Sequence, residues 1–367
     1  MKIIFIGGRE YHALGGIESY MYNLSRKLVE RGHNPVVYCE SDHDETVYEN
    51  GVKVVYVKGP RSNILCKPWV GLKATLMTIV REKDADVIHY NAWPPSMWSF
   101  IARIFGFKTV LQEHGFEWRR SKYTILQKWI LKFMELLTAY TNTNVIAVGK
   151  EQVRYFEKHY RRATTHIPTA VNMPTEQDAD RSDVLKRFGL LQRRYFLFLG
   201  RLSQEKNIDC LIKAFKDSGI GGFCMVIAGS NAANPKYVKR LEDLASGNEN
   251  IKFVGNVYGE EKETLLRYAY AFCLPSAMEG LSIALLEAMS YGLPVIATDI
   301  EANKAVLQAN AVYVRPGNVG DLSEAFRYCV DDQAALSLMA EKNVEEVKEN
   351  YTWDIVTEQY LRYLESI

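Results

Sequence analysis

The feature that most constrains this chain is an alternation of short apolar, β-branched runs with amphipathic helical patterns. The first such helix is predicted from about Ile17 to Arg31. Parallel strands need helical crossovers between them, so the alternation predicts an α/β fold in which helices cover both faces of a doubly wound parallel sheet. The strands predicted in the first half are Lys2–Ile6, Asn34–Cys39, Val52–Val57, Asp86–Tyr90, Lys108–Glu113 and Asn144–Val148.

The alternation stops and then restarts, which predicts a second domain. Two prolines and the polar stretch Glu176–Ser182 interrupt the periodicity in the manner of a linker. A length of 367 residues also suits two domains of about 150 residues each. We expect residues 1–170 and 171–350 to form two Rossmann-like domains that face a cleft, with a C-terminal helix within 351–367 packing back on the first domain.

The composition excludes several classes of function. Lys plus Arg number 45 and Asp plus Glu number 44, so no overall charge favours nucleic acid as a partner. The six cysteines are dispersed without a C-x-x-C, which indicates neither a zinc site nor a disulfide scaffold. No run approaches the roughly 18 to 20 apolar residues that cross a bilayer, and Met1–Gly8 is typical of a first strand. We therefore expect a cytoplasmic protein, or one peripheral to a membrane.

A glycine-rich loop follows the first predicted strand and ends in Gly15 and Gly16, just before a helix. The compressed G-x-G-x-x-G of a dinucleotide-binding turn does not fit this longer loop, so NAD binding is not indicated. Backbone amides at a helix N-terminus suit an anionic or hydroxyl-rich ligand. A plain turn with a glycine cap is the alternative.

Two basic residues, Arg201 and Lys206, lie in the loop Gly200–Asn207 directly after the first predicted strand of the second domain. Displayed at the carboxyl edge of a sheet, these cations would neutralise a diphosphate, and the guanidinium would do so with two hydrogen bonds. A solvated charged loop is the alternative interpretation.

Two glutamates separated by seven residues, Glu279 and Glu287, flank the start of a predicted helix. Ser282 is placed to cap this helix, and Glu287 lies on it, roughly 7 to 8 Å along the axis from the cap at 1.5 Å per residue. The two carboxylates therefore serve different points of one ligand. Between them, three backbone amides are positioned for phosphate oxygens, those of Gly280, Leu281 and Ser282.

Together these motifs resemble glycosyltransferase family 4, whose members are retaining enzymes of the GT-B fold. The resemblance covers essentially the whole chain in order. It implies a nucleotide-diphosphate sugar donor (UDP, dTDP or GDP) bound by the second domain, with the first domain on the acceptor side. The donor contacts that it implies are Arg201 and Lys206 on the diphosphate, Glu287 on the ribose, Glu279 on the sugar, the backbone near Val254 at the base, and Gly15, Gly16, Gly280, Leu281 and Ser282 on phosphate and sugar.

The same resemblance implies catalytic roles for His114, Glu279, Arg201 and Lys206. His114 ends a strand of the first domain and would hydrogen-bond the donor sugar or align the acceptor; a purely structural histidine is the alternative. One departure concerns the hinge, where the usual I-P-N-G-V-D is replaced by Ile167–Asn172 with the sequence I-P-T-A-V-N. Because of this change, the hinge or the acceptor side is expected to differ from the family pattern, whereas the donor motifs are intact.

The stretch from His114 to Tyr123 resembles the capsule and O-antigen branch of the family, which includes rhamnosyltransferases. That likeness suggests a hexose or deoxyhexose donor and a glycan or undecaprenyl-diphosphate-linked acceptor in bacterial surface polysaccharide biosynthesis. Residues 119–133 mix basic with apolar side chains as an interfacial helix does, so they either contact the cytoplasmic face of the inner membrane or pack on the first domain. The apolar residues concerned are Leu126, Trp129, Ile130 and Phe133.

No essential metal or other cofactor is expected. Asp84 and Asp86, like Asp178 and Asp180, imitate a metal-binding D-x-D, but neither pair is placed in the expected crevice. Two rival functions remain at this point: a GT-B-like sugar-nucleotide epimerase, and a sugar-nucleotide sensor without chemistry.

Overall fold

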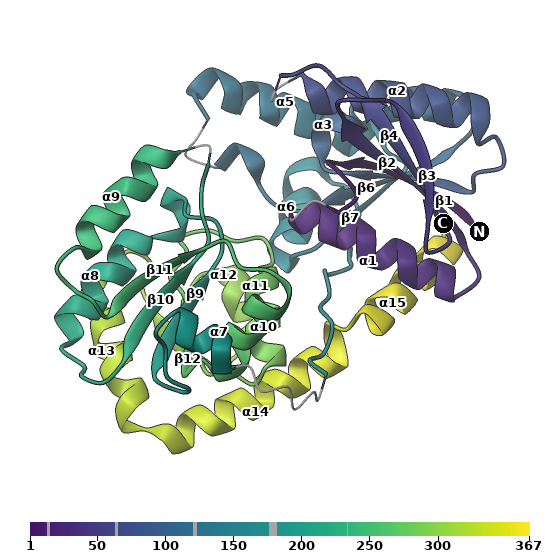
Figure 1. Cartoon of the computed structure of the whole chain (residues 1–367). Coiled ribbons are helices and arrows are strands. Elements are labelled where there is room, and N and C mark those ends of the chain that lie inside the picture. Colours follow the sequence, from purple (N-terminus) through teal and green to yellow (C-terminus); the bar gives the residue numbers. More distant parts are fainter. Residues whose placement is uncertain (13–14, 63–64, 120–122, 176–181, 233) are drawn as a thin grey trace. The chain divides into compact units, whose positions relative to one another are not determined.

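The computed structural model describes residues 1–12, 15–62, 65–119, 123–175, 182–232 and 234–367 (Figure 1). They form two compact units, which are described separately below. The first unit comprises Met1–Ala170 with Trp353–Ile367, and the second comprises Val171–Thr352. Each unit holds a largely or wholly parallel sheet with helices on both faces, which confirms the predicted pair of Rossmann-like domains. The core of the predicted linker, residues 176–181, lies outside the described residues.

The sheet of the first unit has eight strands in the order β3-β4-β2-β1-β5-β6-β7-β8. All neighbours are parallel except β3 and β4. The strands are β1 (Lys2–Gly8), β2 (Asn34–Ser41), β3 (Glu45–Glu49), β4 (Val52–Lys58), β5 (Val87–Asn91), β6 (Lys108–Glu113), β7 (Asn144–Ala147) and β8 (Thr165–His166).

Two helical layers cover this sheet. Side chains of β1 alternate between the layers: Phe5 packs with α1 and α15, whereas Ile4 packs with α2 and α4. The C-terminal helix α15 therefore packs back on the first unit, as predicted. The helices are α1 (Gly16–Glu30), α2 (Cys66–Arg81), α3 (Trp93–Ser96), α4 (Ser99–Ile104), α5 (Ile125–Thr141), α6 (Lys150–Tyr160) and α15 (Trp353–Glu365), with a 3₁₀ turn η1 (Glu117–Arg119).

The second unit has a six-stranded parallel sheet in the order β11-β10-β9-β12-β13-β14. Its strands are β9 (Tyr195–Leu199), β10 (Cys224–Ala228), β11 (Ile251–Gly255), β12 (Ala271–Leu274), β13 (Val295–Thr298) and β14 (Val312–Val314). Its helices are α7 (Ser182–Arg187), α8 (Ile208–Ser218), α9 (Pro235–Ala245), α10 (Gly259–Tyr268), α11 (Ile283–Ser290), α12 (Glu301–Leu307), α13 (Val319–Asp331) and α14 (Gln333–Asn350), with a 3₁₀ turn η2 (Gln204–Lys206).

The two faces of this second sheet bury different clusters. Along β9, Tyr195 and Leu197 point to the side of α10 and α11, whereas Phe196 and Phe198 point to the side of α8 and α13. This run of wholly buried residues is typical of a central strand in a parallel sheet. Among the described residues, no helix combines the length and the apolar character that a bilayer span requires.

Candidate functional site

The loops after β9 and β12 meet at the centre of the second sheet. The strand order reverses at β9, and ligands of doubly wound domains bind at such switch points beyond the carboxyl ends of the strands. Two hydrogen bonds join the loops: Asn207 Nδ2 donates to the carbonyl of Pro275 over 3.1 Å, and the amide of Ala277 donates to the carbonyl of Glu205 over 2.8 Å. The loop that carries Arg201 and Lys206 is therefore hydrogen-bonded directly to the loop that carries Glu279.

Lys206 and Glu279, predicted to contact the diphosphate and the sugar, form an ion pair across this junction. Lys206 Nζ lies 2.5 Å from Glu279 Oε1, and the side chains are 20% and 10% exposed. An ammonium has three donors, so Lys206 can hold the carboxylate and an oxyanion together. Arg201 lies in the same loop and is exposed; among the described residues its guanidinium has no hydrogen bond or ion pair.

The helix after Glu279 begins as predicted. Ser282 caps α11, and its Oγ accepts a hydrogen bond from the amide of Leu285 over 3.3 Å. Glu287 lies in the second turn and accepts a hydrogen bond from Lys262 Nζ over 2.6 Å, with side chains 21% and 33% exposed. Lys262 belongs to α10 and was missed from the sequence because a single lysine in a helix carries no motif. Its ammonium orients the carboxylate that is predicted to bind ribose.

The remaining predicted donor residues of the second unit also lie in loops or at strand ends on the carboxyl side. Gly280 and Leu281 are half-buried between Glu279 and the cap of α11, and Val254 is half-buried near the end of β11. Close backbone approach shapes this edge. Gly229, with φ +142°, lies so near the carbonyl of Gly200 that a Cβ at Gly229 would sit 1.8 Å from that oxygen.

The glycine loop of the first unit leads into α1, and Gly15 is the N-cap residue. Glu18 folds back over this helix start and is only 7% exposed; its Oε1 accepts a hydrogen bond from the amide of Arg9 over 3.1 Å. A carboxylate there is stabilised by the unpaired amides and the helix dipole. Glu18 was missed from the sequence, although an acid in the first turn was the available signal. The N-terminus of α1, beside Gly15 and Gly16, therefore already has the carboxylate of Glu18 next to it.

His114 follows β6 at the carboxyl edge of the first sheet. Its Nε2 lies 3.2 Å from Asn91 Oδ1, and its ring meets the edge of Tyr20 with centroids 5.4 Å apart. Burial lowers the pKa of His114 to about 3, and the nearby charge of Lys67 acts in the same direction. The imidazole is therefore neutral near pH 7 and can share a hydrogen bond with a sugar hydroxyl.

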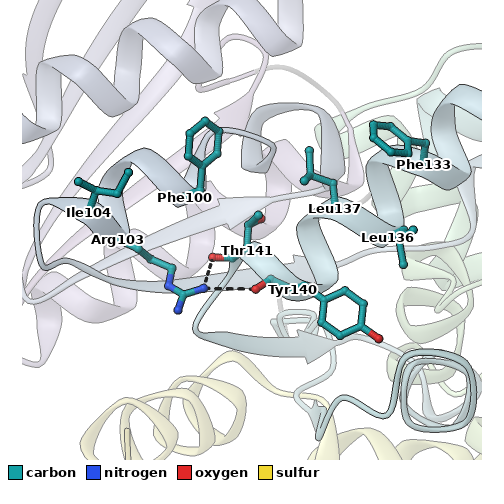
Figure 2. Close-up of a pocket in the computed structure, with 8 residues that line it drawn as sticks. All are labelled: Phe100, Arg103, Ile104, Phe133, Leu136, Leu137, Tyr140 and Thr141. Carbon is teal, nitrogen blue, oxygen red and sulfur yellow. Dashed lines mark hydrogen bonds between the residues drawn. The ribbon is translucent and has the colours of Figure 1, made fainter.

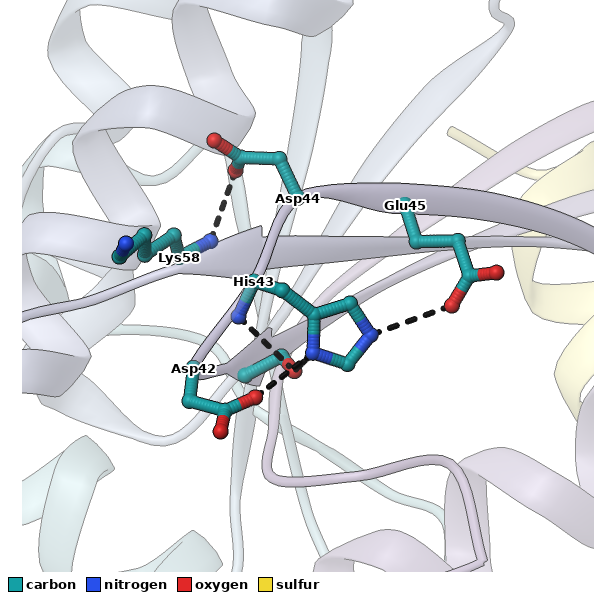
Figure 3. A network of polar contacts seen from close by, with 6 residues as sticks. Asp42, His43, Asp44, Glu45 and Lys58 are labelled. Atoms are coloured by element: carbon teal, nitrogen blue, oxygen red, sulfur yellow. Dashed lines mark hydrogen bonds and ion pairs between the residues drawn. The ribbon is translucent and has the colours of Figure 1, made fainter.

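Two further groups of charged side chains belong to the first unit. In the loop between β2 and β3, His43 lies between Asp42 and Glu45, with ring nitrogens 2.6 and 3.1 Å from their oxygens (Figure 3). Asp84 Oδ1 accepts a hydrogen bond from Lys2 Nζ over 2.7 Å, and Asp86 Oδ2 accepts one from the amide of Lys2 over 2.6 Å. Asp178 and Asp180 lie outside the described residues. Within the described part of the chain, no group of three acidic, histidine or cysteine side chains is arranged to hold a metal ion.

The segment predicted to be interfacial, residues 119–133, spans the last residue of η1 and the first half of α5, with residues 120–122 outside the described part. Leu126, Trp129, Ile130 and Phe133 are 70%, 70%, 47% and 64% exposed. The alternative that this apolar stripe packs on the first domain is therefore wrong, because the opposite side of α5 faces the sheet.

Comparison with known families matches both units. The family model described as Glycosyltransferase Family 4 matches residues 14–173, and that described as Glycosyl transferases group 1 matches residues 180–348.

Individual proteins align along the chain as well. A GDP-mannose-dependent mannosyltransferase acting on monoacylated phosphatidylinositol monomannoside, from Corynebacterium glutamicum, is 25% identical over 96% of this chain and 95% of its own. The O-antigen chain mannosyltransferase B of Escherichia coli is 22% identical over 54% of this chain and 53% of its own. Anabaena HepE, solved with UDP-glucose, superposes with a TM-score of 0.81 at 17% identity, covering all of both chains. This likeness in fold confirms the GT-B architecture.

Proposed function

Because the chain belongs to glycosyltransferase family 4, and is therefore a glycosyltransferase that uses a nucleotide sugar, we propose that it transfers a hexose or deoxyhexose with retention of anomeric configuration. Rhamnose is one candidate sugar, and UDP, dTDP and GDP are the candidate nucleotides. The single observation that carries this proposal is the Lys206–Glu279 ion pair, held where the loops after β9 and β12 are joined. It places a cation beside a carboxylate at the edge where a sugar diphosphate would bind.

In the proposed reaction, the bond between the anomeric carbon and the diphosphate oxygen breaks, and a bond forms from that carbon to an acceptor oxygen. The departing phosphate takes the proton of the acceptor hydroxyl. Negative charge grows on the leaving phosphate, and Lys206 and Arg201 stabilise it without a metal ion. Glu279 holds the sugar and Glu287 the ribose, while neutral His114 contacts the sugar or aligns the acceptor.

We place the acceptor among glycans and undecaprenyl-diphosphate-linked sugars, in the synthesis of bacterial surface polysaccharide at the cytoplasmic face of the inner membrane. Two relatives support this placement, since one acts on a mannosylated phosphatidylinositol and another is an O-antigen chain mannosyltransferase. The exposed apolar residues of α5 also suit a chain that works beside lipid.

The test is nucleotide binding followed by turnover. UDP, dTDP and GDP, each with chelator and then with Mg²⁺, are added to the full chain in thermal unfolding. A nucleotide at a hundredfold excess over its Kd stabilises the folded state by about 2.7 kcal/mol. The base that raises the midpoint then selects the sugar nucleotides for assays of nucleotide release.

Two variants decide whether the predicted cations bind the diphosphate. The pair Arg201→Ala with Lys206→Ala should weaken nucleotide binding at least tenfold, since each charged hydrogen bond contributes about 1.5–3 kcal/mol. Lys239→Ala is the matched control, because Lys239 is a 77% exposed lysine of α9 in the same unit. Unchanged affinity in the double variant would reject the assignment, and a strict need for Mg²⁺ would reject transfer without metal.

A further inference from the structure

Helix α5 presents an apolar stripe to solvent. Successive helical residues are rotated by 100°, which gathers seven large side chains of α5 within about 140° of its circumference. The most exposed of them are Ile125 at 78% and both Leu126 and Trp129 at 70%. The full set is Ile125, Leu126, Trp129, Ile130, Phe133, Leu136 and Tyr140. A surface helix normally turns such a stripe toward the core, so α5 has the reverse arrangement.

The inner face of α5 explains why the helix does not rotate. Glu135 is fully buried there and accepts hydrogen bonds from Trp118 Nε1 over 2.9 Å, from Tyr155 Oη over 3.0 Å and from the hydroxyl of Tyr160. Burial raises the pKa of this carboxyl. Rotating α5 to turn the apolar stripe inward would break the hydrogen bonds of the Glu135 carboxylate. The fold therefore fixes the outward orientation of the stripe.

Neighbouring helices extend the apolar surface. Helix α4 packs against both α2 and α5 and exposes Phe100 and Ile104, at 40% and 76%. Helix α2 exposes Trp69 and Val80, at 50% and 67%. We call the exposed apolar side chains of α2, α4 and α5 and their flanking residues the outer face. It comprises Leu65, Trp69, Leu76, Val80, Phe100, Ile104, Phe105, Ile125, Leu126, Trp129, Ile130, Phe133, Leu136 and Tyr140.

A groove of about 580 Å³ runs along this face between α4 and α5. Figure 2 shows the side chains that line it, with Phe100 and Ile104 on α4 and Phe133 and Leu136 on α5. At one end Arg103 Nη1 donates hydrogen bonds to the carbonyls of Tyr140 and Thr141 over 3.2 and 3.0 Å. The groove is therefore apolar along its length, with a guanidinium at its end.

The charges that these three helices expose have one sign. Their single acidic residue, Glu135, is the buried one described above, whereas their basic residues are Lys67, Lys73, Arg81, Arg103, Lys128 and Lys132. Lys73 is paired with Asp44 of the β2–β3 loop over 3.0 Å, and Lys132 lies 4.3 Å from the centre of the Trp118 ring. The other basic residues of these helices contribute positive charge beside the apolar surface, although the net charge of the whole chain is only +1.

We propose that the outer face docks on an anionic lipid bilayer, with acyl chains entering the groove between α4 and α5. Exposed tryptophans, large exposed apolar side chains on three adjoining helices, and basic charge of one sign together match the chemistry of an anionic headgroup region. A protein partner would have to supply an apolar acidic surface of the same extent.

Docking in this orientation serves the predicted site. Helix α5 connects β6 to the parallel strand β7, so its first turn lies at the carboxyl edge of the sheet, where His114 lies. Ile125, Leu126 and Trp129 in that first part of α5 bring this edge close to the lipid surface. A lipid-linked acceptor would then meet the edge without leaving the bilayer. This last step rests on the proposed function, whereas docking itself does not.

The experiment is flotation of the full chain with vesicles of phosphatidylcholine, alone or mixed with phosphatidylglycerol. We expect binding to the mixed vesicles, at least about tenfold weaker binding to phosphatidylcholine alone, and release by salt. Trp129→Glu with Phe133→Glu should reduce binding to mixed vesicles at least about tenfold, and Lys128→Glu with Lys132→Glu should do the same. Leu191→Glu is the matched control, since Leu191 is 72% exposed on the second unit.

Each outcome has one consequence. Wild-type protein that stays with the buffer fraction, or stripe variants that float like wild type, would overturn the proposal. A wild-type dimer that sediments as a monomer after Trp129→Glu with Phe133→Glu, without vesicle binding, would assign the outer face to a second copy instead. Thermal midpoints near that of wild type show that the variants fold. A chain that binds nucleotide but no vesicle overturns only the docking, and one that binds vesicles but no nucleotide overturns only the proposed function.

Discussion

Replacing Glu287 by Gln separates its predicted role at the ribose from its role in the fold. The carboxylate receives a hydrogen bond from Lys262 Nζ over 2.6 Å, and the two side chains are 21% and 33% exposed. A pair this accessible to water contributes roughly 0.2–1 kcal/mol to stability. Glu287→Gln should therefore lower the free energy of unfolding by less than about 1 kcal/mol.

The effect on ligand binding should be larger. A vicinal diol of ribose that donates to a carboxylate makes charge-assisted hydrogen bonds, each contributing about 1.5–3 kcal/mol. Loss of one such bond weakens nucleotide binding roughly 10- to 150-fold, at 1.4 kcal/mol per factor of ten. Lys262→Met leaves the carboxylate in place and removes only its orienting partner, so we expect a loss of roughly two- to fivefold.

Isothermal titration with the tightest-binding nucleotide measures both effects. The double variant Glu287→Gln with Lys262→Met completes a cycle, and its loss should be smaller than the sum of the single losses, because Lys262 acts through Glu287. Glu249→Gln is the control, since Glu249 is an exposed glutamate of the second unit outside the site. An affinity of Glu287→Gln within about twofold of wild type, at unchanged stability, would refute the ribose contact.

Three further predictions concern the stability of the units. Because burial lowers the pKa of His89 to about 3 in the fold against about 6.5 in the unfolded chain, stability of the first unit should be full above pH 6.5 and fall as the pH drops toward 3, as measured by urea unfolding. Tyr360→Phe removes the 2.7 Å hydrogen bond to His89 Nδ1 and should cost about 1–3 kcal/mol in the same assay; an unchanged midpoint would contradict this. Gly229→Ala would place a Cβ 1.8 Å from the carbonyl of Gly200 and should sharply lower the melting temperature, whereas Gly221→Ala, with open space around it, should not.

Several elements could be predicted because their signals are local. Strand β6 begins and ends at the predicted residues, strands β1, β2, β4 and β7 begin at them, and Ser282 caps α11 as its position indicated. Alternating patterns and caps depend on neighbours within one or two turns, so the sequence alone reveals them.

Other elements were missed or misjudged for equally physical reasons. The edge strand β3 has mostly exposed side chains, so it lacks the apolar run that marks the other strands. Between β5 and β6 the chain forms two short helices, α3 and α4, because the backbone turns between Ser96 and Ser99. Helix α14 buries few of its residues and was not recognised, since its apolar periodicity is weak.

The features of the site also divide into residues that local motifs reveal and contacts that only the fold creates. Lys206 and Glu279 could each be assigned to the donor edge from motifs, but their ion pair joins residues 73 positions apart in sequence, and only packing of the loops after β9 and β12 forms it. The contact of Lys262 with Glu287 is of the same long-range kind.

Short-range periodicity in the sequence encodes the two doubly wound α/β units, most of their strands and helices, and the motifs at strand ends. The tertiary structure alone decided which side of α5 faces the sheet. The apolar stripe of α5 is visible in the sequence, yet it would be equally regular in a buried helix. Glu135 turns it outward because its three hydrogen-bond donors, from Trp118, Tyr155 and Tyr160, lie on other elements that only the fold brings together.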